Sequence, residues 1–174
     1  MYFSCLVGRE QPFMNKKLDD YLCKKYPKIF SERNKSMQET CMCWGFECGD
    51  GWFYLINRLC QAIQFRIDNP GYNTEGKMEI PQVVAAQVKE KYGTLRFYFT
   101  GGNDEIHGMV RLAEYLSGSI CEVCGKMDET IGQTKGWIKT ICFECSDKNR
   151  PWQPNTDSEL FKILESIKNE NPQK

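Results

Sequence analysis

The chain has 174 residues, 41% of them hydrophobic and 26% charged, so it can bury the core of one domain or of one domain with a small satellite. Its 23 basic and 23 acidic side chains give a formal net charge of zero, which argues against a protein that coats nucleic acid along its whole length. No apolar run approaches the roughly 20 residues that cross a bilayer, and the first residues do not resemble a signal peptide. We therefore expect a soluble intracellular protein with no membrane partner.

The first half of the chain predicts two helices. Residues 14–26 have helical spacing, and residues 31–40 are polar and predict a loop. The run Cys41–Trp52 is rich in Gly, Cys and aromatic residues and predicts a packed strand and a tight turn. A second helix is expected from about Gly51 to Asp68, with Asp50 as its N-cap. Its apolar stripe consists of Trp52, Leu55, Ile56, Leu59, Cys60, Ile63 and Ile67.

A β-hairpin is predicted over residues 83–99, with its turn at Lys91–Gly93. A third helix follows, capped by Asn103 or Asp104 and ending at Gly118. Alternation of period two predicts two sets of core-facing strand residues. They are Val84, Ala86 and Val88 on the first strand, and Leu95, Phe97 and Phe99 on the second.

Two Cys-x-x-Cys pairs, Cys121/Cys124 and Cys142/Cys145, are separated by 17 residues. Each pair can direct two thiolates at one tetrahedral ion, and Gly125 permits the turn that forms a knuckle. This spacing predicts one zinc ion, and four ligands leave no open position for water, so the ion is expected to be structural. A thioredoxin-like redox role would need a βαβ context that the pattern lacks.

The predicted fold class is α+β: a small antiparallel sheet packed by helices, with an appended four-cysteine module of zinc-ribbon or treble-clef type. We expect an α+β core domain over residues 1–118, a zinc-binding module over 119–150, and a C-terminal helix and tail over 151–174. Pro151 and Pro154 predict a linker, and Thr156-x-x-Glu159 is a capping box that opens the last helix.

Other reactive side chains indicate no catalytic site. Cys41, Cys43 and Cys48 could supply three ligands of a second metal, but buried free thiols are the favoured interpretation. The single histidine, His107, is the only candidate base of a His-dependent triad, and no spacing of carboxylates singles out a dyad. These observations favour a protein without enzymatic activity.

The segment Lys89–Tyr98 is the second distinctive feature. If Leu95 and Phe97 face the core, Arg96 and Tyr98 project from the other face, near Lys89 and Lys91. Cations beside an aromatic ring suit a ligand with phosphates and a base. An ordinary amphipathic hairpin with a solvated Lys/Arg/Tyr face explains the pattern equally well.

The Gly-Asp-Gly-Trp turn at residues 49–52 has two interpretations. It is either a helix cap with a core tryptophan, or the rim of a binding site where backbone amides meet an anion. On the second interpretation, Asp50 and Trp52 join the ligand-binding residues.

The succession WGFECGDGW, KEKYGTLRFY, AEYLSGSICEVCG and GWIKTICxxC resembles an uncharacterised family of small proteins of bacteria and their phages, over roughly Trp44–Cys145. The resemblance implies a phage or prophage setting in the cytoplasm of a bacterial host, and it supports the zinc site without supplying a substrate. The matching positions are Gly49, Asp50, Gly51, Trp52, Lys89, Glu90, Lys91, Gly93, Leu95, Arg96, Tyr98, Glu114, Ser117 and the four cysteines of the two pairs.

The favoured function is therefore a non-enzymatic, zinc-stabilised protein that binds a nucleotide-like or other anionic ligand. In a phage setting this ligand could be a signalling nucleotide of host immunity. The alternative is an accessory factor that binds nucleic acid or docks on a host protein through the zinc module and the basic segment Phe13–Lys35. An enzyme such as a nuclease or hydrolase is the least favoured. The oligomeric state is not determined by the sequence.

Overall fold

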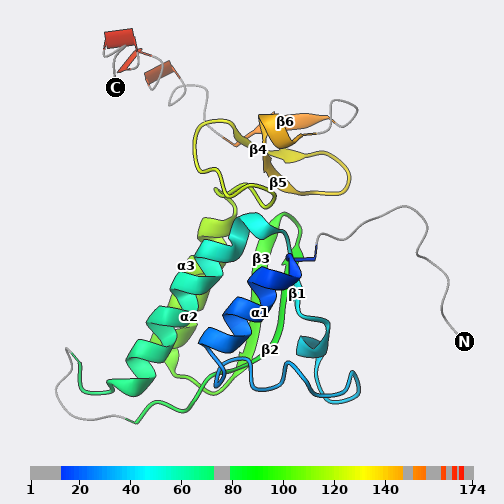
Figure 1. Ribbon diagram of the computed structural model, residues 1–174. Coiled ribbons are helices and arrows are strands. Elements are labelled where there is room, and N and C mark those ends of the chain that lie inside the picture. The colour runs from blue at the N-terminus through cyan, green and yellow to red at the C-terminus, as the bar shows by residue number, and fades with distance from the viewer. Residues whose placement is uncertain are drawn as a thin grey trace, which may run out of the picture.

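A computed structural model of the chain describes residues 13–72, 79–146 and 151–155, together with residues 162, 163, 166, 167, 169 and 170. It confirms the α+β class: helices pack on a small sheet, and a second small sheet carries the cysteine pairs. Figure 1 shows the larger body below and, at one end of it, the module of β4 (Ile131–Thr134), β5 (Thr140–Cys142) and β6 (Trp152–Pro154).

Three helices form at positions that the apolar periodicity predicts. Asn15 caps the first and Asn103 the third, each by accepting a backbone N–H with its side-chain oxygen. The helices are α1 (Lys16–Lys25), α2 (Phe53–Asp68) and α3 (Asp104–Ser117), and short 3-10 turns form η1 (Cys41–Trp44) and η2 (Asp50–Trp52).

The prediction that Asp50 caps the second helix is wrong. α2 has no side-chain cap, and η2 precedes it. The Asp50 carboxylate instead accepts the backbone N–H of Asn15 at 2.6 Å, across 35 positions of sequence. It therefore ties the start of α1 to the turn before α2.

The first sheet has the strand order β1-β2-β3, with β2 at its centre. β2 and β3 form the predicted antiparallel hairpin, whereas β1 pairs with β2 in parallel, so the sheet is mixed. The strands are β1 (Phe46–Glu47), β2 (Val84–Lys91) and β3 (Thr94–Thr100).

The predicted core face of β2 is correct at Val88 and wrong at Val84 and Ala86, because a β-bulge interrupts the alternation. Ala85 lies opposite Phe99 and Gln87 opposite Tyr98, so Ala86 is an extra residue. Ala85 and Val88 are therefore the fully buried residues of this strand, while Ala86 is only half-buried.

One continuous apolar core joins the sheet to the three helices, and Figure 1 shows α1 and α2 in front of the strands. Phe30 makes edge contacts with Phe46 of β1 and Phe97 of β3, at ring-centroid distances of 5.0 and 6.4 Å. Tyr98 points to the opposite face of the sheet and is 43% exposed, which shows that no helix in the described part of the chain covers that face there.

The module has its own antiparallel sheet, in the order β5-β4-β6, and a separate small core. The linker predicted from Pro151 and Pro154 instead contains the strand β6, because its backbone pairs with β4 and the Trp152 ring packs on Phe143 at 5.5 Å. The elements are β4 (Ile131–Thr134), β5 (Thr140–Cys142), η3 (Phe143–Cys145) and β6 (Trp152–Pro154).

Two sequence expectations fall mostly outside the described residues. The capping box Thr156–Glu159 is not described, although the described positions among 162–170 are helical. A helix beginning at Cys145 would distinguish a treble clef from a ribbon, but η3 ends at Cys145 and Ser146 is extended, so no helix continues from Cys145; residues 147–150 are not described. The division into three domains remains a prediction.

Candidate functional site

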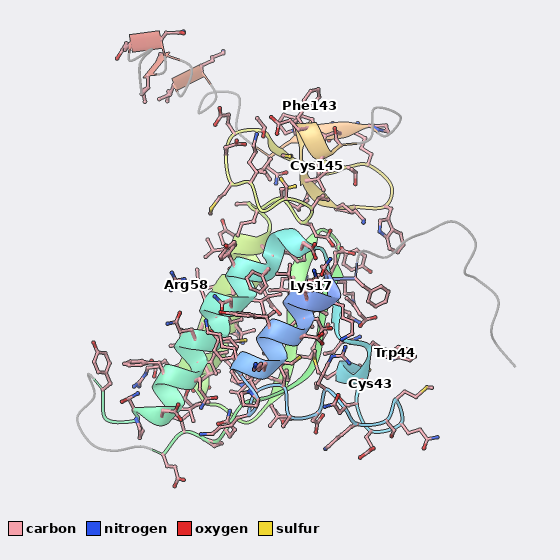
Figure 2. The ribbon with its side chains drawn as sticks, viewed as in Figure 1. Lys17, Cys43, Trp44, Arg58, Phe143 and Cys145 are labelled. Carbon is pink, nitrogen blue, oxygen red and sulfur yellow. The ribbon has the colours of Figure 1, made fainter. Side chains whose placement is uncertain are left out.

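Four cysteines from two knuckles that are distant in the sequence converge in the module, and the first knuckle faces the core. Cys121 and Cys124 follow α3, Cys142 immediately precedes η3, and Cys145 is the last residue of η3. Their sulfur atoms all lie within 4.8 Å of one another, and Cys124 Sγ lies 3.7 Å from Cys142 Sγ. Figure 2 shows Cys145 within the module, with Phe143 beside it.

This geometry fits a tetrahedral metal ion. Four thiolates at about 2.3 Å from zinc stand about 3.8 Å apart, close to the observed contact. Local backbone bonds build the first knuckle, because the N–H of Gly125 donates to Cys121 O at 2.9 Å and Gly125 adopts a φ of 77°. The four cysteines could therefore hold one ion with no open coordination position.

The pKa values of these thiols shift in opposite directions. Burial acts to raise the pKa of Cys121, but hydrogen bonds from the backbone of Cys124 and Cys142 outweigh it, so the pKa is lowered. Burial, followed by hydrogen bonds with the neighbouring thiols, raises the pKa of Cys145. Four charged thiolates cannot share this space without a counter-ion, and a bound dication removes that cost.

The Gly-Asp-Gly-Trp turn packs directly against the first knuckle. The N–H of Gly51 donates to Glu122 O at 2.8 Å, and the N–H of Gly49 donates to Glu122 Oε1 at 3.0 Å. A Cβ on Gly51 would overlap the carbonyl oxygen of Cys121. Both glycines are therefore required by the close approach of two backbones.

The two predicted ligand-binding residues of this turn lie away from the exposed face of the sheet. Trp52 is fully buried, and its Nε1 donates to Ile120 O at 3.0 Å, so it joins the core to the segment that enters the module. Asp50 is exposed but accepts the N–H of Asn15. The structure does not bring either residue together with Lys89, Arg96 and Tyr98.

The turn of the hairpin is a second contact between core and module. Gly93 O accepts the hydroxyl of Thr140, on β5, at 2.6 Å, and Gly93 N–H donates to Glu90 Oε1 at 2.7 Å. Glu90 is only 9% exposed, and Thr140 is fully buried. The hairpin turn is thus held from both sides.

Glu122 is a site residue that the sequence analysis missed. It is fully buried, its backbone N–H donates to Thr140 O at 2.9 Å, and its Oε2 has no hydrogen-bond partner among the described residues. Burial raises its pKa to about 7, and Glu90 adds to the rise, while Lys139 and the amide of Gly49 oppose it. Its position between Cys121 and Cys124 was the sequence signal that could have identified it. Glu122 bonds both the Gly-Asp-Gly-Trp turn and Thr140, and so links the two contacts between core and module.

Three of the predicted ligand-binding residues do come together, on the uncovered face of the sheet. Lys89 and Arg96 are directly opposite each other on β2 and β3. Lys89 Nζ lies 5.7 Å from the ring centroid of Tyr98. Lys91 is exposed and lies further toward the turn. On the side of Lys89 away from Arg96, Glu47 of β1 is its register partner, and the Glu47 carboxylate accepts a hydrogen bond from Gln87 at 2.7 Å.

None of these three cations forms an ion pair within the described part of the chain. Arg96 Nη1 donates to Thr94 Oγ1 and to Leu95 O, at 2.6 and 2.7 Å, which leaves the rest of its guanidinium without a protein partner. Like charges directly opposite each other on a sheet are unfavourable. The Lys89/Arg96 pair therefore places two positive charges side by side on this face, with Glu47 on the far side of Lys89.

Two further positions of the sequence motifs have a structural role. The free edge of β3 is capped by α3, because Ser117 Oγ accepts Leu95 N–H at 2.8 Å and Glu114 Oε1 accepts Phe97 N–H at 2.9 Å. These side chains satisfy backbone donors that would otherwise be available to another strand.

The remaining cysteines and the histidine do not form a second cluster. Among the described residues, the four cysteines of the module are the one group of three or more side chains that could hold a metal. Cys48 is buried, which raises its pKa, and Cys43 donates to Thr40 O at 3.1 Å. His107 is exposed on α3, with its ring 4.8 Å from that of Phe99.

Comparisons with known proteins add no relative. No protein-family model matches the chain, and neither a curated protein nor a solved structure is detectably similar to it. Among the described residues, no helix has the length and apolar character needed to span a membrane. The resemblance to a family of bacterial and phage proteins therefore stays a prediction.

Proposed function

We propose that this protein is a zinc-stabilised, non-enzymatic binding protein that holds a nucleotide-like anion on the uncovered face of its first sheet. The observation that carries the proposal is the Lys89/Arg96 pair, two cations opposite each other that form no ion pair among the described residues, with the Tyr98 ring beside them. A phosphate between them would relieve their repulsion, and a base would find the exposed ring of Tyr98.

The structural metal has an indirect part in this function. The four cysteines match the donor set of structural zinc sites, and the module that they close carries Thr140, which holds the hairpin turn. Zinc would thus maintain the position of the strand ends that carry Lys91 and Arg96 without contacting the ligand.

Titration of the metal-loaded, full-length protein with thymidine 5′-monophosphate tests the proposal. Arg96→Ala removes a charge-assisted contact of about 1.5–3 kcal/mol, so affinity should fall about ten- to hundredfold while the melting temperature changes little. Tyr98→Phe should weaken binding to a smaller extent. Arg58→Ala is the matched control, because Arg58 projects from α2 on the helical side, as Figure 2 shows, and its hydrogen bond within the described part of the chain is to Gln61 of the same helix.

The opposite pattern would overturn the proposal: a large loss of stability in Arg96→Ala, with nucleotide affinity preserved in the folded fraction. Absence of any nucleotide binding by the wild-type protein would do the same. Mass and ultraviolet absorbance of the natively purified protein would report bound metal and copurified nucleotide together. The host signalling nucleotide implied by the sequence resemblance remains a prediction for that measurement.

A further inference from the structure

A second cation–ring pair lies on the same hairpin as Lys89 and Tyr98. Lys91 Nζ lies 5.5 Å from the ring centroid of Tyr92, which compares with 5.7 Å between Lys89 Nζ and the Tyr98 ring. Tyr92 is 69% exposed, and its ring pairs with no other aromatic ring among the described residues. The Tyr92 ring therefore contributes little to the core.

The backbone of Tyr92 is unusual as well. Its φ is 55°, and no other residue besides glycine has a positive φ in the described part of the chain. The two-residue turn Tyr92-Gly93 joins Lys91 to Thr94, and such turns favour Asn, Asp or Gly at the first position, because a left-handed conformation is costly for a bulky side chain. Neither turn formation nor packing therefore favours tyrosine at this position.

The surroundings of the turn keep this strained conformation in place. Glu90 accepts the N–H of Gly93 from the core side, and Thr140 of the module donates to Gly93 O. A strained residue persists where its surroundings determine its backbone in this way, and such residues gather at ligand sites. The module therefore helps to hold the backbone of the turn that carries Tyr92 beside Lys91.

The two rings stand too far apart for one nucleotide. Tyr98 lies opposite Gln87, which is four positions before Lys91 on β2. At about 3.4 Å per residue, the two rings are separated by roughly 15 Å along the hairpin. Lys89, Arg96 and Lys91 lie between them, so cations occupy the interval between two flat surfaces.

We propose that Tyr92 is a second ligand-contacting residue, and that the hairpin takes a short single strand of nucleic acid with bases stacked on Tyr98 and Tyr92 and phosphates over the intervening cations. Each base would take the place of the lysine on its ring, and the lysine would move to a phosphate. This inference rests on the anion-binding function proposed above. A strand of a few nucleotides is also compatible with zero net charge, which argued only against binding along the whole protein.

The test compares thymidine 5′-monophosphate with single-stranded tetrathymidylate, a probe whose bases stack weakly on one another. The metal-loaded wild type should bind the tetranucleotide more tightly than the mononucleotide. Tyr92→Asn should lower tetranucleotide affinity by roughly five- to hundredfold, the range for loss of one base–aromatic stack, and leave mononucleotide affinity unchanged. Its melting temperature should rise, because Asn suits the left-handed turn position.

A rise in stability together with a loss of affinity separates a binding role of Tyr92 from a structural one. Tyr92→Gly, which also relieves the backbone, is the second variant, and Tyr115→Ala on α3 is the control, since Tyr115 is 79% exposed and outside the hairpin. If the wild type binds both probes equally, or if both Tyr92 variants retain full tetranucleotide affinity, the inference is overturned and the proposed function stands. If neither probe binds, both are overturned.

Discussion

The Gly-Asp-Gly-Trp turn and the hairpin Lys89–Tyr98 have similar compositions, with glycine, charge and aromatic rings in a short run, but the structure uses them in different ways. The first is covered by the module, where Trp52 is buried and Gly51 touches the backbone of Glu122. The second is divided, because its turn is bound to Thr140 while its outer face stays open. A glycine-rich aromatic motif can thus serve an internal interface as readily as a ligand.

The largest effect should come from removal of the metal that closes the module. Cys124→Ser leaves three thiolates, so the protein should lose most of its roughly one zinc per chain, and its melting temperature should fall by about 10 °C or more. Metal analysis and thermal unfolding measure the two effects. Cys41→Ser is the control, because Cys41 is exposed and outside the cluster. Full zinc retention by Cys124→Ser would refute the site.

A methyl group at the contact between turn and knuckle should have the next largest effect. In Gly51→Ala the new Cβ overlaps the backbone of Cys121, so the free energy of unfolding should fall by about 2–4 kcal/mol. Gly108→Ala is the matched control: it lies in α3 with nothing within 4 Å of its Cβ position, and it should stabilise by about 0.5–1 kcal/mol. Chemical denaturation of both variants measures these free energies. If Gly51→Ala and Gly108→Ala changed stability equally, the close contact of the Gly-Asp-Gly-Trp turn with the knuckle would be contradicted.

The contact at the hairpin turn should contribute less. Thr140→Val removes the hydroxyl that donates to Gly93 O and leaves a buried carbonyl without this partner, so the free energy of unfolding should fall by about 1–2 kcal/mol. Thr130→Val, whose hydroxyl bonds Asp128 in an exposed loop, should cost less than about 0.5 kcal/mol. Denaturation curves of the two variants would separate the turn contact from a general effect of losing a hydroxyl.

The smallest effect is expected at the other end of α2, away from the module. Arg66 bonds Glu105 at 2.6 and 2.7 Å, and its hydrogen bonds lower the pKa of Glu105. A carboxyl group whose pKa is lowered by folding stabilises the protein at pH values above its ordinary pKa of about 4.5. That stability is lost as the pH falls through the folded-state pKa.

Glu105→Gln should therefore destabilise by less than about 1 kcal/mol at pH 7, because the Glu105 side chain is 42% exposed. The difference from wild type should shrink as the pH falls below about 4.5 and vanish once the pH is below the folded-state pKa, as denaturation at several pH values would show. Zinc content should be unchanged at pH 7. A difference that persists at low pH would show that the ion pair is not its source.

The sequence by itself determined the elements whose signals are local. The periodicity of α2 and α3, the alternation of β3 and the Cys-x-x-Cys spacing each depend on residues close to one another in the chain, and the structure has these elements where they were predicted. The outward direction of Arg96 and Tyr98 also follows from alternation alone, because the core-facing residues of β3 are apolar.

Only the tertiary structure decided how these elements meet. The bulge at Ala86, the bond of Asp50 to Asn15, and the burial of Glu122 against Gly49 each depend on contacts between residues that are 11 to 73 positions apart in the chain. Each contact uses a peptide N–H group, which every residue except proline carries, so the identity of that residue does not reveal the contact. Hence the four cysteines that could hold a metal were identified from their spacing, whereas the partners of the Gly-Asp-Gly-Trp turn could not be.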